Sequence, residues 1–208
     1  MAVLVFTEHW DGQFKKSTFE LVSYAYKLAE MANTHTVALC IGEVDEGNLK
    51  QLADYGAEKI VAVRQDHLKY MDNQAYTSVI QQVADKEEAD MLVLAHNNTG
   101  KALAPRLSVR MKAALGSEVN QLPSGMDPFA INKKVFSGKA YANVVMKTDK
   151  KILTLAQNSF GMYENTQEPV IETFEPAVSS DQIQTKVVDV EKHRDKLLLT
   201  DAELVVSG

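Results

Sequence analysis

Two short segments of this sequence carry side chains suited to chemistry. In the first, His9 lies between the carboxylates of Glu8 and Asp11. Such a set suits proton transfer, because histidine titrates near neutral pH and a carboxylate orients its ring. The competing interpretation is an exposed turn that presents Trp10 to a partner or to the protein's own core. We favour the turn, because neighbours in sequence need not meet in space.

The second segment has the composition of a helix start that receives an anion. It consists of Asn97, Asn98, Thr99, Gly100 and Lys101. Free N–H groups at a helix amino terminus favour negative charge, and glycine permits close approach of the backbone. The segment is therefore a candidate cradle for a nucleotide phosphate. One glycine and one lysine do not make a phosphate-loop motif, so a capped turn with nothing bound is the favoured interpretation.

The other reactive residue types stand alone. Cys40 lies among apolar neighbours, where a small buried side chain is its usual role. His35, His67 and His193 have no second histidine three or four residues away that could complete a metal site. His96 has the best position of the histidines for a functional role, because it adjoins the candidate anion segment. Neither a glycine-rich dinucleotide motif nor a nucleophile elbow occurs. We therefore expect no catalytic residue and no bound metal.

Composition excludes several classes of protein. The 208 residues carry a formal charge of −6, so no basic field attracts nucleic acid or anionic lipid. One cysteine rules out a disulfide framework. No apolar run approaches the roughly 18 residues of a membrane helix, and no signal or transit peptide precedes the first apolar run. We expect a cytoplasmic protein of bacterial type, without membrane insertion or nucleic-acid binding.

The first half of the chain alternates apolar runs with helical spacing. Buried strands are expected at residues 2–6, 36–41, 59–63 and 91–95, each followed by a helix. Such repetition predicts an α/β fold in three layers, with a doubly wound and mostly parallel sheet. The candidate residues follow its first and fourth strands, at the edge where such sheets bind ligands.

The second half changes character after Gly116. Short alternating runs at residues 129–136, 140–146 and 152–156 predict three antiparallel strands that extend the sheet or pack beside it. Helical spacing is missing there.

The end of the chain divides into a connector and a stub. We expect a scaffold domain at residues 1–172 and a solvated acidic connector at 173–203 with one strand at 185–190. Residues 204–208 have the pattern of a buried strand that ends in glycine. They are expected to begin a further domain, so the chain looks truncated.

Four segments, in order, resemble the electron-transfer flavoprotein α subunit. Residues 100–108 are similar to its Gly-Lys/Arg and Pro-Arg-Leu-Ala run, and 116–119 to its small-Ser-Asp-Val step. Residues 135–140 resemble its aromatic-Ala-Gly-Asn-Ala hairpin. Residues 199–208 resemble the start of its flavin-binding domain. The chain departs from the family at Lys133 and Gln157, near positions where the family has arginines.

The resemblance implies a fold, a partner and a cofactor. The fold would be of the adenine-nucleotide α-hydrolase type, acting as a scaffold that dimerises with a β subunit. FAD would be held beyond Gly208, so none of these residues would bind it. The complex would carry electrons from acyl-CoA dehydrogenases of fatty-acid oxidation to a quinone-linked oxidoreductase, as a carrier and not an enzyme. AMP binding belongs to the family's β subunit, which weakens the anion site.

Two other interpretations stay open. The chain could be a nucleotide-binding sensor that uses residues 97–101, or residues 205–208 could begin an ATP pyrophosphatase domain. The sequence after Gly208 would decide the second, because Gly-Arg-Gly favours the flavoprotein and Gly-x-Asp-Ser the pyrophosphatase.

Overall fold

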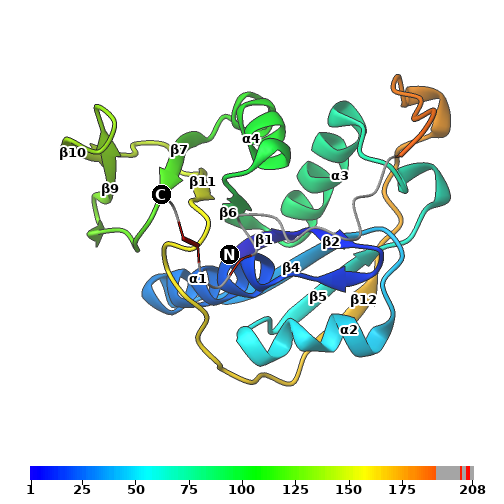
Figure 1. The fold of residues 1–208 in the computed structure, drawn as a ribbon, viewed down its shortest axis with the longest axis horizontal. Helices are drawn as coiled ribbons and strands as arrows, with labels where there is room; N and C mark the ends of the chain where they lie inside the picture. Colours follow the sequence, from blue (N-terminus) through cyan, green and yellow to red (C-terminus); the bar gives the residue numbers. More distant parts are fainter. Residues whose placement is uncertain (191–201, 203–204, 207–208) are drawn as a thin grey trace.

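A seven-stranded parallel sheet forms the centre of the protein (Figure 1). The computed structural model describes residues 1–190, 202, 205 and 206. The strand order is β12-β5-β4-β1-β6-β11-β7. The strands are β1 (Ala2–Thr7), β4 (His35–Ile41), β5 (Lys59–Val63), β6 (Ala89–Ala95), β7 (Ala114–Val119), β11 (Lys151–Leu155) and β12 (Val170–Thr173). The predicted α/β class with a doubly wound sheet is confirmed.

Helices cover both faces of this sheet. They are α1 (Lys16–Ala32), α2 (Glu46–Gln51), α3 (Asn73–Lys86) and α4 (Asn98–Met111), with 3₁₀ turns η1 (Ala53–Tyr55), η2 (Asp66–Leu68) and η3 (Ser180–Gln182). α1 and α2 lie on one face, and α3 and α4 on the other (Figure 1). From β1 the chain adds β4 and β5 on one side, and it then returns to add β6 on the other side of β1. Because each crossover is right-handed, helices that connect strands in opposite directions along the sheet lie on opposite faces.

Both faces of the sheet are buried, which explains why its strands are apolar at successive positions. In β1, Val3 and Val5 pack in the core under α1, whereas Leu4 and Phe6 pack in the core under α3. All six residues of β1 are buried. A strand covered on both sides has no polar face, so its sequence cannot alternate.

Two short antiparallel sheets complete the fold. β2 (His9–Trp10) pairs with β3 (Gln13–Phe14) directly after β1. β8 (Gly125–Met126), β9 (Phe129–Val135) and β10 (Ala140–Val145) form a three-stranded sheet beside β7. The predicted antiparallel extension in the second half is thus confirmed for its first two strands.

The third strand of that extension is a correction. We expected residues 152–156 to be antiparallel, but β11 lies parallel between β6 and β7 in the main sheet. β7 itself was not predicted. Gly116 lies inside it, where an added Cβ would come within 2.6 Å of Ile131 Cδ1 and 2.8 Å of Leu153 Cδ2. The glycine is there for close packing, not as the end of the parallel half.

The connector begins differently from the expectation. β12 adds a parallel strand to β5 and ends at Thr173, so the first residue assigned to the connector belongs to the sheet. Val178 is buried in the core beside α3. No strand forms at 185–190, which corrects that prediction. The edge of β5 is taken by β12 instead.

The predicted stub falls mainly outside the described residues. Of residues 204–208, the structure describes only Val205 and Val206. The domain boundaries at 172 and 203 therefore stay predictions.

Candidate functional site

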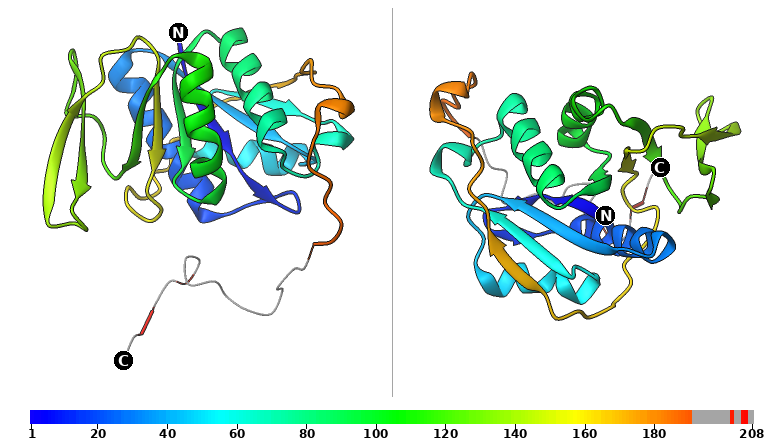
Figure 2. Two further views of the ribbon diagram at one scale, coloured as in Figure 1. Left: turned by 90° about the horizontal axis from the view of Figure 1, so that it is seen from above. Right: turned by 180° about the vertical axis from the view of Figure 1, so that it is seen from behind.

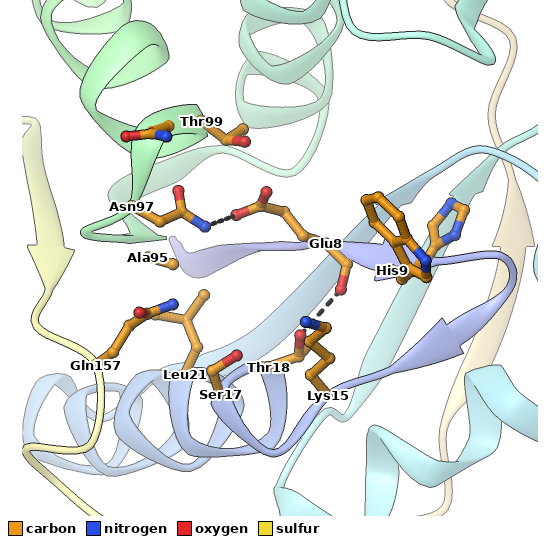
Figure 3. A pocket seen from close by; sticks show the side chains of 12 residues that line it. Glu8, His9, Lys15, Ser17, Thr18, Leu21, Ala95, Asn97, Thr99 and Gln157 are labelled. Atoms are coloured by element: carbon orange, nitrogen blue, oxygen red, sulfur yellow. Dashed lines mark hydrogen bonds between the residues drawn. The ribbon is translucent and has the colours of Figure 1, made fainter. Parts of the chain in front are cut away.

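A pocket of about 440 Å³ opens at the carboxyl ends of β1 and β6 (Figure 3). These strands are neighbours at the point where the strand order reverses, which is where open α/β sheets bind ligands. Its polar wall comes from three segments of the chain. The first runs from the end of β1 into the first turn of α1 and supplies Glu8, Lys15 and Thr18. The second is the start of α4, with Asn97 and Thr99, and the third is Gln157 after β11.

A carboxylate lies over the amino terminus of α4. Asn97 Nδ2 donates to Glu8 Oε1 at 2.7 Å, while Asn97 Oδ1 accepts from the Gly100 N–H at 2.9 Å (Figure 3). Asn97 is therefore the N-cap of α4, which agrees with the capped-turn interpretation. The positive end of the helix dipole already faces one negative charge, so a phosphate placed there would meet repulsion from Glu8.

The five candidate residues of the anion site are only partly brought together. Asn97, Asn98 and Thr99 line the pocket, whereas Gly100 and Lys101 are not among its lining residues. At Gly100 an added Cβ would lie 1.8 Å from the carbonyl oxygen of Ala95. The glycine lets the start of α4 pack against the end of β6, the strand that precedes it. A phosphate loop also needs glycine for close approach, so the two roles look alike in sequence.

Nucleotide titration tests the remaining anion-site hypothesis. We expect no heat when AMP or ATP is titrated to millimolar concentration, because Glu8 opposes the phosphate. The Glu8→Gln variant removes that charge and keeps an amide oxygen as acceptor for Asn97. Binding by the variant alone would assign the block to Glu8. Saturable heat with the unaltered chain would contradict the argument.

His9 is held by backbone groups at both ring nitrogens. The Gly12 N–H donates to its Nδ1 at 3.2 Å, so Nε2 carries the proton and donates to the Ile41 carbonyl at 3.1 Å. Both ring nitrogens are thus engaged by backbone groups. Trp10 is about half exposed, as the turn interpretation predicted.

His96 is also held by neighbours. Thr154 Oγ1 accepts from the Glu118 N–H at 3.0 Å and forms a hydrogen bond with His96 Nδ1 at 2.9 Å. Burial lowers the pKa of His96, and the positive charge of Lys101 lowers it further. His96 Nε2 lies 3.9 Å from Glu118 Oε2.

The single cysteine is structural, as predicted. Cys40 is about 1% exposed, and burial raises the pKa of its thiol to about 12. Reactive cysteines are thiolates near neutral pH, so this one is inert.

The described part of the chain contains neither a metal-binding cluster nor a membrane-spanning helix. No group of three or more histidine, cysteine or acidic side chains is arranged to hold a metal ion among those residues. None of the helices there combines the length and apolarity needed to cross a bilayer.

Sequence reasoning missed Glu20, a buried carboxylate in α1. It is 3% exposed. Its Oε1 accepts from the N–H groups of Ser159, Phe160 and Gly161 at 2.8, 2.7 and 3.0 Å, and Oε2 accepts from the Asn158 N–H at 2.8 Å. The loop after β11 is thus an anion-binding nest filled by the protein's own side chain. Backbone donors leave no trace in a sequence, so no signal marked the pair.

Taken together, the strand order and the helices on both faces define a doubly wound α/β domain with a projecting antiparallel sheet. The chain belongs to the family described as the electron transfer flavoprotein domain, which matches residues 3–179. The resemblance found in the sequence is confirmed at the level of the family.

Curated relatives of this family align with almost the whole chain. The electron transfer flavoprotein subunit alpha of Bacillus subtilis is 25% identical over 209 residues, covering 99% of this chain and 63% of the relative. The acryloyl-CoA reductase electron transfer subunit beta of Anaerotignum propionicum is 23% identical over 235 residues, covering 99% of this chain and 64% of the relative. Protein FixB of Clostridium saccharobutylicum is 22% identical over 211 residues, covering 99% and 63%.

The coverage and the names of these relatives decide how finely this chain can be assigned within the family. The chain spans slightly less than two thirds of their length. One is named a subunit alpha and another a subunit beta, so the names agree on an electron-transfer subunit and differ on its type.

Proposed function

We propose that residues 1–172 are the scaffold of an α-type electron-transfer flavoprotein subunit that pairs with a β subunit. The observation that carries the proposal is the family match over residues 3–179, together with relatives named subunit alpha that align with about 99% of this chain. The complex would be a cytoplasmic carrier that takes electrons from acyl-CoA dehydrogenase-type flavoenzymes and passes them toward the quinone pool.

We place the FAD of this carrier outside residues 1–208. The pocket between β1 and β6 does not fit the pyrophosphate of FAD, because Glu8 already occupies the amino terminus of α4 and Gly100 is packed against Ala95. The part of the relatives that this chain does not cover is the part proposed to hold the flavin. No electron-transfer step is therefore assigned to the residues described here.

Co-expression with a β-type subunit from the same genome tests the proposal. We expect the two chains to purify together through affinity and size-exclusion steps. Residues 1–208 alone should show no flavin absorbance. A chain that continues beyond residue 208 should bind about one FAD. Failure to form any complex would contradict the subunit assignment, and stoichiometric flavin on residues 1–208 alone would contradict the proposed location.

A further inference from the structure

The pocket between β1 and β6 has features that the proposed carrier function does not use. It lies near the middle of the main sheet, whereas the antiparallel sheet of β8, β9 and β10 projects at the β7 end (Figure 2). Its volume of about 440 Å³ falls in the range of small-molecule sites. Figure 3 shows two opposite walls, one with Glu8, Asn97 and Thr99 and the other with Ser17, Leu21 and Gln157. A small molecule in this pocket would therefore meet polar groups on two sides.

Several polar groups in the lining of this pocket are not used by the fold. The side chains of Ser17, Thr99 and Gln157 form no hydrogen bond with any residue that the structure describes. Glu8 uses one acceptor position for Asn97, although a carboxylate has about four. Asn97 Nδ2 uses only one of its hydrogens for Glu8. Together these groups can both donate and accept, as a ligand with several hydroxyl groups requires.

The pair of Glu8 and Asn97 has the geometry to bind a vicinal diol. Glu8 Oε1 and Asn97 Nδ2 are 2.7 Å apart, so an acceptor and a donor lie side by side in the lining. Two hydroxyls on neighbouring carbons also lie side by side. One can donate to the Glu8 carboxylate, in a charge-assisted hydrogen bond, while the other accepts the second hydrogen of Asn97 Nδ2. Asn97 is held in place as the N-cap of α4, so the pair is preorganised.

The charges around the pocket select a neutral ligand. Its lining includes one carboxylate, that of Glu8, and one ammonium group, that of Lys15. An anion would be repelled by Glu8, and a cation would be repelled by Lys15 and by the positive end of the α4 dipole. Sugar phosphates and nucleotides are therefore disfavoured, whereas an uncharged hydroxylated molecule meets no repulsion.

An aromatic side chain and two apolar ones complete the lining. Trp10 lines the pocket and is about half exposed. The face of an indole ring carries partial negative charge, and the C–H groups of a sugar ring carry partial positive charge, so the two pack together. Leu21 and Ala95 add apolar surface. A sugar ring combines an apolar face with a rim of hydroxyls, and this pocket offers contacts for both.

We propose that this pocket binds a neutral monosaccharide, with a vicinal diol on Glu8 and Asn97 and the apolar face of the ring on Trp10. The polar side chains of the opposite wall bind the remaining hydroxyls. The site is an addition to the scaffold role and does not depend on it.

Titration of the unaltered chain with D-glucose, D-mannose and D-ribose tests the proposal. Trp10 is the single tryptophan of the chain, so its fluorescence and its indole N–H signal in NMR spectra report directly on the pocket. We expect a saturable change in the millimolar range with at least one of these sugars. The phosphate ester of that sugar should bind about tenfold more weakly, because its charge meets Glu8.

Two substitutions remove proposed contacts and keep the shape of the side chain. Glu8→Gln should weaken binding of the sugar about tenfold, because it removes the charge of the acceptor. It should also reduce the discrimination against the phosphate ester. Thr99→Val removes a hydroxyl and should weaken binding severalfold. Thr166→Val is the matched control, because Thr166 is exposed and does not line the pocket, and it should leave the affinity unchanged.

Four results would overturn the proposal. These are no saturable change with any of the three sugars, binding of the phosphate ester as tight as that of the sugar, unchanged affinity in both Glu8→Gln and Thr99→Val, and binding of adenosine without binding of any sugar. Each of them would leave the proposed subunit function standing, because that function is tested by complex formation.

Discussion

Replacing Glu20 with alanine is expected to lower the free energy of unfolding by about 3 kcal/mol, because buried charged hydrogen bonds are costly to remove. Four backbone N–H groups of residues 158–161 lose their acceptor. For a domain of this size the thermal midpoint should fall by about 6–12 °C.

Glu20→Gln should lie between the wild-type protein and the alanine variant. Its remaining oxygen can still accept from three N–H groups, but its amide nitrogen then faces the Asn158 N–H. Glu30→Ala is the control, because Glu30 is an exposed residue of the same helix that pairs with Lys27. It should change stability by less than about 0.5 kcal/mol. Calorimetry measures the midpoints, and a Glu20→Ala protein that melts with the wild type would contradict the argument.

Asp72→Ala should destabilise the protein by about 3 kcal/mol, the second large effect. The Asp72 carboxylate is 3% exposed and serves two segments. Its Oδ1 caps α3 by accepting from the Gln74 and Ala75 N–H groups at 2.9 and 3.0 Å. Its Oδ2 accepts from the N–H and hydroxyl of Thr185 at 3.2 and 2.8 Å, which ties residues 174–190 to α3.

Asp72→Asn separates these two roles. The amide keeps an oxygen for the helix cap and turns two donors toward Thr185, so residues 174–190 should be released while α3 stays capped. Hydrogen exchange should show faster exchange at the Thr185 amide and unchanged protection in α3. Equal protection of Thr185 in both proteins would show that the hydrogen bond does not hold the segment. Asp66→Asn, an exposed carboxylate in the same region, is the control.

The contribution of Asp72 should also depend on pH. Burial alone would raise the pKa of Asp72, but hydrogen bonds from Ala75, Thr185 and Gln74 lower it below its ordinary value. A carboxyl whose pKa is depressed on folding stabilises the protein fully above its unfolded pKa of about 3.9. That stability is lost as pH falls through the folded pKa. The stability difference between the wild type and Asp72→Asn should therefore shrink below about pH 4, as denaturant titrations at several pH values will measure.

Much of the architecture follows from local pattern. The apolar runs that became β1, β4, β5 and β6, and the helices between them, were predicted because burial on both faces leaves a continuous apolar signal. The right-handed crossover rule then orders them. β7, β11 and β12 were missed or misassigned, because their partners are distant in sequence and a short run does not say which strand it joins.

The candidate site was likewise predictable only in part from the sequence. Local chemistry correctly marked the end of β6 as a helix start, and Asn97 caps α4 as such a start requires. The role of Gly100 stayed open in the sequence, because a glycine that lets the chain's own backbone approach looks the same there as one that lets a phosphate approach.

Sequence alone determined that this chain is an acidic α/β domain with one cysteine, and its motifs were sufficient to suggest the family. Only the tertiary structure decided that Glu8 lies over α4, that Glu20 fills the nest after β11, and that Asp72 holds Thr185. Each of these pairs joins residues about 90 to 140 positions apart. Such contacts depend on where parallel strands place their ends, and sequence patterns report only on near neighbours.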